Sequence, residues 1–203
     1  MIRNIIFDLG NVLLSWKPGD FLLKSGYPPD EAGRVLETVF RSREWFSLDN
    51  GDITRSEAID LIVSKSVFRR EEIASFFNLS TRIIFPLQEN VKVLPALKKE
   101  GFRLYYLSNY PLEFFNETKS IYDFFNFFDG GIISAEVKIS KPDPAIYKTF
   151  LSKFSLDPKE CLYIDDMEIN VRSAGSVGIS GIHFSENDSL EEILKKRLNK
   201  SFN

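Results

Sequence analysis

Five short apolar runs, each followed directly by Asp or Ser, constrain the fold of this chain more than any other feature. They are residues 5–7, 102–107, 131–133, 161–164 and 181–184. The later runs are separated by segments with apolar residues at helical spacing, such as Ile146, Phe150 and Phe154. Buried strands that alternate with helices of this length predict parallel βαβ units. We therefore expect an α/β fold with a Rossmann-like parallel sheet.

The long interval between the first and second runs breaks this alternation. Residues 16–85 show no comparable strand pattern and have the character of helices throughout. One helix start is explicit, because Thr54 is followed three residues later by Glu57 in a capping-box pattern. We therefore expect a helical cap domain, residues 16–85, inserted into an α/β core formed by residues 1–15 and 86–203.

Composition limits what such a chain can bind. The 203 residues include one cysteine and one histidine, which excludes an internal disulfide and a structural zinc site with four nitrogen or sulfur ligands. Any metal should therefore be a hard cation held by oxygen. A net charge of -3 gives no general attraction to nucleic acid, and no apolar segment is long enough to span a membrane. Because the first residues do not resemble a signal peptide, we expect a cytoplasmic protein without nucleic-acid or membrane partners.

Polar side chains follow three of the predicted strands, at the edge where open parallel sheets bind ligands. They are Asp8, Ser108, Asn109, Asp165 and Asp166. Lys141 lies in a loop before a later helix and could join them. A single Asp or Ser at a strand end could simply cap the next helix. The adjacent carboxylates of Asp165 and Asp166 repel each other unless a cation compensates them, so the set predicts a site for Mg²⁺ and phosphate.

Four short motifs follow one another along nearly the whole chain. They are residues 7–13 (FDLGNVL), residues 107–109 (LSN), residues 141–143 (KPD), and residues 164–166 (IDD) with Asn170. In order and spacing they resemble the motifs of the haloacid dehalogenase-like (HAD) hydrolase superfamily. The insertion after the first motif is similar to the helical cap of the subgroup that contains small sugar-phosphate phosphatases.

The resemblance implies a nucleophile and a metal site. Asp8 would attack phosphorus and form an aspartyl phosphate, which water then hydrolyses. Mg²⁺ would be held by the carboxylate of Asp8, the backbone carbonyl of Gly10 and the carboxylate of Asp166. Asp165 would lie beside the metal or bind it through water. The implied activity is that of a Mg²⁺-dependent phosphatase for small phosphorylated metabolites.

The resemblance also implies a phosphate-binding group. Ser108 and the backbone of Asn109 would donate hydrogen bonds to phosphate oxygens. Lys141 would offset the negative charge of both Asp8 and the phosphoryl group. The expected partner is therefore a small phosphomonoester.

The first motif departs from the family pattern at Gly10, where the family usually has a second Asp that acts as general acid and base. Glycine can still supply the backbone carbonyl. Loss of the acid typically costs about 10²- to 10⁴-fold in rate. Three consequences stay open: the enzyme is slow, a cap residue or water replaces the acid, or the substrate has a good leaving group. A sugar 1-phosphate fits the last case, since its anomeric hydroxyl is more acidic than an ordinary alcohol.

Two alternatives to a phosphatase stay open. A metal-independent 2-haloacid dehalogenase also lacks the second Asp and uses its Asp to attack carbon. The paired carboxylates of Asp165 and Asp166 favour the phosphatase. The other alternative is a non-catalytic binding or regulatory protein of the same fold, and retention of Asp8, Ser108 and Lys141 speaks against it.

The cap is expected to set substrate specificity. Candidate residues are Trp16, Lys17, Arg41, Arg43 and Trp45. They combine aromatic surfaces for a sugar ring with cations for phosphate. An equally good interpretation is that the two tryptophans pack the cap. The sequence does not determine the oligomeric state.

Overall fold

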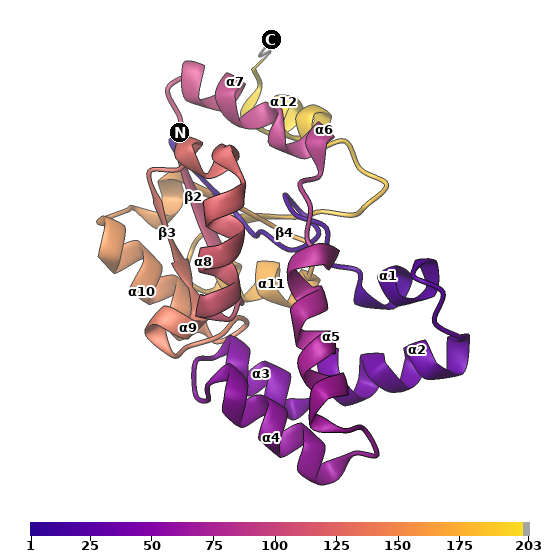
Figure 1. The fold of residues 1–203 in the computed structure, drawn as a ribbon. Helices are drawn as coiled ribbons and strands as arrows, with labels where there is room; N and C mark the ends of the chain where they lie inside the picture. Colours follow the sequence, from indigo (N-terminus) through magenta and orange to yellow (C-terminus); the bar gives the residue numbers. More distant parts are fainter. Residues whose placement is uncertain (201–203) are drawn as a thin grey trace.

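The computed structural model describes residues 1–200, which form a five-stranded parallel sheet with helices on both faces (Figure 1). The strands are β1 (Asn4–Phe7), β2 (Arg103–Ser108), β3 (Gly130–Ile133), β4 (Cys161–Asp165) and β5 (Ser180–His183). Their order across the sheet is β3-β2-β1-β4-β5. The predicted Rossmann-like α/β fold is confirmed, and each predicted strand end lies within one residue of the observed end.

The sheet is buried because alternate side chains of the central strand enter two separate hydrophobic cores. Ile5 and Phe7 pack on one face, and Ile6 packs on the other against Tyr147 and Phe150. All of these side chains have an exposed fraction of 0%. Strands covered on both faces read as continuous apolar runs, which explains why the pattern was visible in the sequence.

Helices of the core surround this sheet. They are α6 (Gln88–Val91), α7 (Val93–Lys99), α8 (Leu112–Ile121), α9 (Ser134–Val137), α10 (Pro144–Phe154), α11 (Glu168–Ser176) and α12 (Leu190–Leu198). Short 3₁₀ segments occur at Asp123–Phe127 and Pro158–Glu160. Because β1 has β2 on one side and β4 on the other, the strand order reverses at β1. This is the place where open sheets of this kind bind ligands.

The chain between β1 and β2 forms helices, as predicted. They are α1 (Pro18–Lys24), α2 (Pro29–Val35), a π-helical turn (Leu36–Phe40), α3 (Arg43–Asp49), α4 (Arg55–Lys65) and α5 (Arg70–Ile83). Thr54 and Glu57 form the predicted capping box of α4. These helices gather at one end of the sheet, with α3 close to α9 (Figure 1). The domain boundaries at residues 15/16 and 85/86 stay a prediction.

Among residues 1–200, no helix combines the length and apolar character that crossing a membrane requires.

Candidate active site

Asp8 stands directly after β1, at the centre of the sheet edge. Its backbone N–H donates to the carbonyl of Ile164 at 2.8 Å, which continues the pairing of β1 with β4. Its carboxylate accepts a hydrogen bond from the N–H of Leu9 at 2.7 Å. The chain then turns sharply at Asn11, which has a φ of 52°. The turn leaves the Asp8 carboxylate fixed at the strand end, with the residue 6% exposed.

Lys141 places a buried cation between two carboxylates. Its Nζ lies 2.8 Å from a carboxylate oxygen of Asp8 and 2.7 Å from one of Asp165. Burial disfavours the charged ammonium, yet the two carboxylates hold the pKa of Lys141 above its usual range. Lys141 is therefore a cation under the conditions in which the neighbouring carboxylates are ionised.

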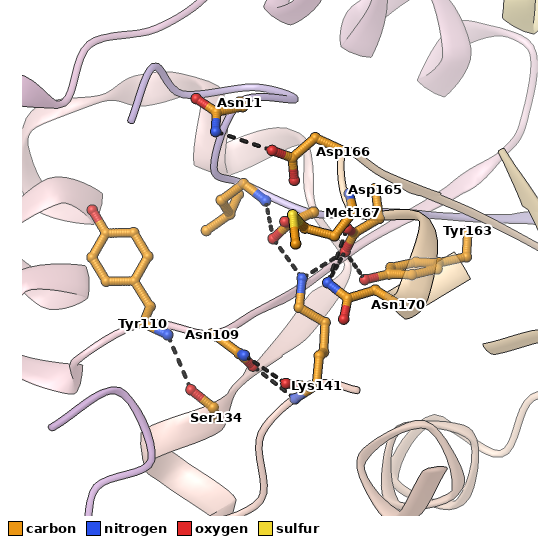
Figure 2. A network of polar contacts seen from close by, with 12 residues as sticks. Asn11, Asn109, Tyr110, Ser134, Lys141, Tyr163, Asp165, Asp166, Met167 and Asn170 are labelled. Carbon is orange, nitrogen blue, oxygen red and sulfur yellow. Dashed lines mark hydrogen bonds and ion pairs between the residues drawn. The ribbon is translucent and has the colours of Figure 1, made fainter. Parts of the chain in front are cut away.

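The loop that carries Lys141 is held by the side chain of Asn109, just beyond β2. The Asn109 amide nitrogen donates to the Lys141 carbonyl at 2.9 Å, and its amide oxygen accepts from the Lys141 N–H at 2.8 Å (Figure 2). Ser108, the last residue of β2, is buried in the wall of the same site. The second motif therefore fixes the backbone of the third.

Asp165 is the most fully bonded carboxylate of the site. Besides Lys141, it accepts hydrogen bonds from the hydroxyl of Tyr163, the N–H of Met167 at 2.7 Å, and the amide of Asn170 at 3.0 Å and 3.1 Å (Figure 2). Burial opposes its charge, but Lys141 and these donors hold the pKa of Asp165 below its usual value. Its bonding pattern suits a residue that orients Lys141.

Asp166, the residue after β4, contributes a third carboxylate to the site. Its carboxylate accepts one hydrogen bond, from the Asn11 amide at 3.0 Å (Figure 2). Asp8, Asp165 and Asp166 each offer a carboxylate oxygen within 4.8 Å of the others. Burial raises the pKa of Asp8 to about 7, and it also raises the pKa of Asp166. Three carboxylates this close fit a hard divalent cation, which prefers oxygen ligands and neutralises their repulsion.

A cavity of about 290 Å³ opens above these carboxylates, between the cap and the core. Its lining includes the polar residues Asp8, Ser108 and Lys141. The lining also includes a large apolar and aromatic group, formed by Leu14, Trp16, Trp45, Phe46, Ile84, Tyr110, Pro111 and Phe114. The rings of Trp16 and Trp45 stack at 5.6 Å, so these tryptophans both pack the cap and face the cavity.

The cations proposed for specificity lie elsewhere. Lys17 forms an exposed ion pair with Glu186, and Arg41 forms one with Glu37. Arg43 is exposed at the start of α3. None of these three cations is among the residues that line the cavity in the described part of the chain. Of the residues predicted to set specificity, the structure thus brings only the tryptophans to the cavity.

Sequence reasoning missed several residues of the site. Tyr163 looked like an ordinary apolar strand residue, although its hydroxyl reaches Asp165. Asp49, at the end of α3, also lines the cavity. The segment from Asp49 to Thr54 resembles a turn and capping segment common in the subgroup, but that resemblance does not place the carboxyl group of Asp49 in the cavity. Asn11 could have been singled out, because a small polar residue after Gly10 suits a turn with positive φ.

The arrangement combines a fixed carboxylate, a buried cation beside it and further carboxylates able to hold a metal, at the carboxyl end of a parallel sheet. Such a set of groups suits a hydrolase. Residues 2–178 match the haloacid dehalogenase-like hydrolase family, and the chain belongs to that family. The family identified from the four motifs is thereby confirmed.

Two curated relatives and one solved structure illustrate the similarity. The sesquiterpene phosphatase astK of Aspergillus oryzae is 28% identical over 192 residues, which cover 95% of this chain and 93% of astK. The drimenol cyclase drtB of Aspergillus calidoustus is 26% identical over 197 residues, but the match spans only 36% of drtB. A HAD family enzyme from Bacteroides thetaiotaomicron, solved with magnesium and inorganic phosphate, has a TM-score of 0.75 at 23% identity, and the match covers 95% of this chain and 99% of that one. This last likeness supports the fold.

Proposed function

We propose that the protein is a phosphatase that hydrolyses small phosphomonoesters through an aspartyl phosphate at Asp8 and requires Mg²⁺. One observation carries the proposal: the Nζ of Lys141 lies 2.8 Å from Asp8 and 2.7 Å from Asp165, beside a third carboxylate, Asp166. A nucleophile so close to a cation and to a candidate metal site suits attack on a dianionic phosphate.

In this proposal each residue of the site has a distinct role. Asp8 attacks phosphorus, and the P–O bond to the organic group breaks. Lys141 lowers the repulsion between the Asp8 carboxylate and the incoming phosphoryl oxygens. Ser108 and the backbone of Asn109 line the cavity where they can donate to those oxygens. Asp165 keeps the ammonium of Lys141 directed at Asp8.

Asp8 and Asp166, with the carbonyl of Gly10, are the groups that would hold Mg²⁺, which would supply charge neutralisation for the phosphoryl group. Asp165 is a weaker candidate ligand, because four groups of the chain already donate to its carboxylate. The family enzyme of similar fold that was solved with magnesium and phosphate supports this assignment.

The rival activity, dehalogenation, needs no metal. A dehalogenase would not need the carboxylate of Asp166, which offers an oxygen within 4.8 Å of one of Asp8. The similarity to astK, a protein named as a phosphatase, points the same way. A non-catalytic role fits poorly, because burying Lys141 with two carboxylates carries a desolvation penalty that gives little net stability.

Replacing Asp8 by Asn tests the proposal. We expect Asp8→Asn to abolish release of phosphate from 4-nitrophenyl phosphate in the presence of Mg²⁺, because an amide is not a nucleophile for phosphorus. EDTA should also stop the reaction of the unmodified protein. Activity that survives in EDTA would remove the metal from the proposal, and activity in Asp8→Asn would remove the nucleophile.

Two kinds of organic group are candidates for the part of the substrate that carries the phosphate. The absence of an acid at Gly10 favours a sugar 1-phosphate, whose leaving oxygen is acidic. The apolar residues of the cavity lining, among them Trp16 and Trp45, favour the phosphate of an apolar alcohol, in line with the name of astK. Comparison of kcat/KM for glucose 1-phosphate and farnesyl phosphate, with glucose 6-phosphate as reference, separates the two.

A further inference from the structure

One carboxyl group in the cavity has no role in the reaction proposed above. Asp49 is the last residue of α3 and lines the cavity from the cap side, whereas Asp8 and Lys141 line it from the core. Among residues 1–200, no hydrogen bond or ion pair engages the Asp49 carboxylate. An unpaired carboxyl group that faces an active-site cavity is free to bond to a ligand.

The backbone around Asp49 is anchored to the core close to the site. The hydroxyl of Ser134 donates to the Asp49 carbonyl, and the hydroxyl of Ser140 donates to the side chain of Asn50 at 2.8 Å. Ser140 directly precedes Lys141, and the Ser134 hydroxyl accepts from the N–H of Tyr110 (Figure 2). The end of α3 is therefore held against the same loops that carry the phosphate-binding residues.

The surroundings of Asp49 favour its protonated form. The cavity that it lines also has Trp45, Tyr110 and Phe114 in its wall, and burial raises the pKa of Asp49 to about 8. At neutral pH the group is therefore mostly a neutral carboxylic acid. It can donate a hydrogen bond or a proton to a ligand from the cap side of the cavity.

We propose that Asp49 is the general acid that protonates the leaving oxygen, in place of the acid that is missing at Gly10. The inference rests on the proposed phosphatase function. In the first step an oxygen of Asp8 bonds to phosphorus, the electron pair of the breaking P–O bond passes to the ester oxygen, and that oxygen takes the proton of Asp49 to leave as an alcohol. In the second step Asp49 takes a proton from the attacking water, and phosphate and free Asp8 result.

The position of Asp49 also bears on the substrate. The phosphate would lie against Asp8 and Lys141 on the core side of the cavity, so an acid on the cap side would face the organic group. With this proton available, the substrate no longer needs an acidic leaving oxygen. Ordinary alcohols then become suitable leaving groups, which removes the main reason to restrict the enzyme to sugar 1-phosphates.

The test compares two substrates of nearly the same shape, 4-nitrophenyl phosphate and 4-nitrobenzyl phosphate. The phenolate leaves without a proton, whereas the benzyl alkoxide needs one. We expect Asp49→Asn to lower kcat/KM for the benzyl ester by about 10²-fold and to leave kcat/KM for the phenyl ester unchanged. The ratio kcat/KM isolates the phosphoryl transfer to Asp8, so a slow second step does not obscure the result.

Two further variants complete the design. Asp30→Asn is the matched control, because Asp30 is exposed near the start of α2 and lies outside the cavity, so both substrates should react as before. Gly10→Asp combined with Asp49→Asn should recover the benzyl activity, since a Cβ at Gly10 would meet nothing nearer than Trp16 at 3.9 Å.

Equal losses on both esters in Asp49→Asn would overturn the proposal in favour of a binding or structural role. An unchanged rate for the benzyl ester would overturn it as well. Failure of the underlying function shows itself differently, because the unmodified protein would then hydrolyse neither ester.

Discussion

At the scale of single residues, Lys141 is the group whose loss should matter most for stability. It is 6% exposed and compensates both Asp8 and Asp165. We expect Lys141→Met to lower the free energy of unfolding by about 3–5 kcal/mol, because it leaves buried carboxylates without a cation. Urea denaturation without Mg²⁺ measures this loss. Lys92→Met, which removes an exposed pair with Glu89, is the control and should change stability little. Equal losses in both variants would contradict the role given to Lys141.

A second prediction at this scale concerns Asp49 and the pH dependence of stability, and it does not involve activity. Its pKa is raised from 3.8 to about 8 in the folded protein, so the folded state binds the proton more tightly than the unfolded chain does. Stability contributed by the protonated group is therefore complete below about pH 4 and is lost as the pH rises to about 8. Asn cannot ionise. The melting temperature of Asp49→Asn minus that of the unmodified protein should therefore increase as the pH rises between these two values. A difference that is constant with pH would show that Asp49 titrates normally.

At the scale of elements, the contact between the end of α3 and the start of α9 places the cap over the site. Gly51 has a φ of +74°, and a Cβ there would lie 2.6 Å from the carbonyl oxygen of Ala135. We expect Gly51→Ala to destabilise the fold by more than about 1 kcal/mol and to reduce activity, because α3 and Asp49 must move away from the core.

Gly26 provides the control for this change. It also has a positive φ, +89°, but a Cβ there would meet nothing within 4 Å. Gly26→Ala should therefore carry the backbone strain alone and keep its activity. If both variants behave alike in urea denaturation and in turnover, the contact of α3 with α9 does not position the cap.

At the scale of the whole molecule, Mg²⁺ should stabilise the folded state. Asp8, Asp165 and Asp166 come together only in the folded chain, so a cation that they bind favours folding. At a Mg²⁺ concentration a hundredfold above Kd, the gain is about 2.7 kcal/mol. Thermal denaturation with Mg²⁺ and with EDTA measures it. Asp166→Asn should lose most of this shift, and the same shift in both proteins would place the metal elsewhere.

Much of the fold could be predicted from the sequence because its signals are local. A buried parallel strand is a continuous apolar run. Polar residues stand at or directly after the ends of β1, β2 and β4, and the structure places them around one cavity. The cap was visible as an interval of helical pattern without strands. The predictions for Lys17 and Arg43 rested on residue type alone, and the direction of an exposed side chain leaves no trace in local sequence.

The sequence by itself determined the succession of strands and helices along the chain, the family, and the set of polar residues at the strand ends, since each of these depends on neighbours along the chain. Only the tertiary structure decided that Lys141 lies between Asp8 and Asp165, and that Asp49 faces the same cavity. Those positions depend on contacts between distant segments, such as the bond from Ser134 to Asp49 across 85 residues. Such contacts form only when the cap packs against the core, because packing joins surfaces that the sequence keeps apart.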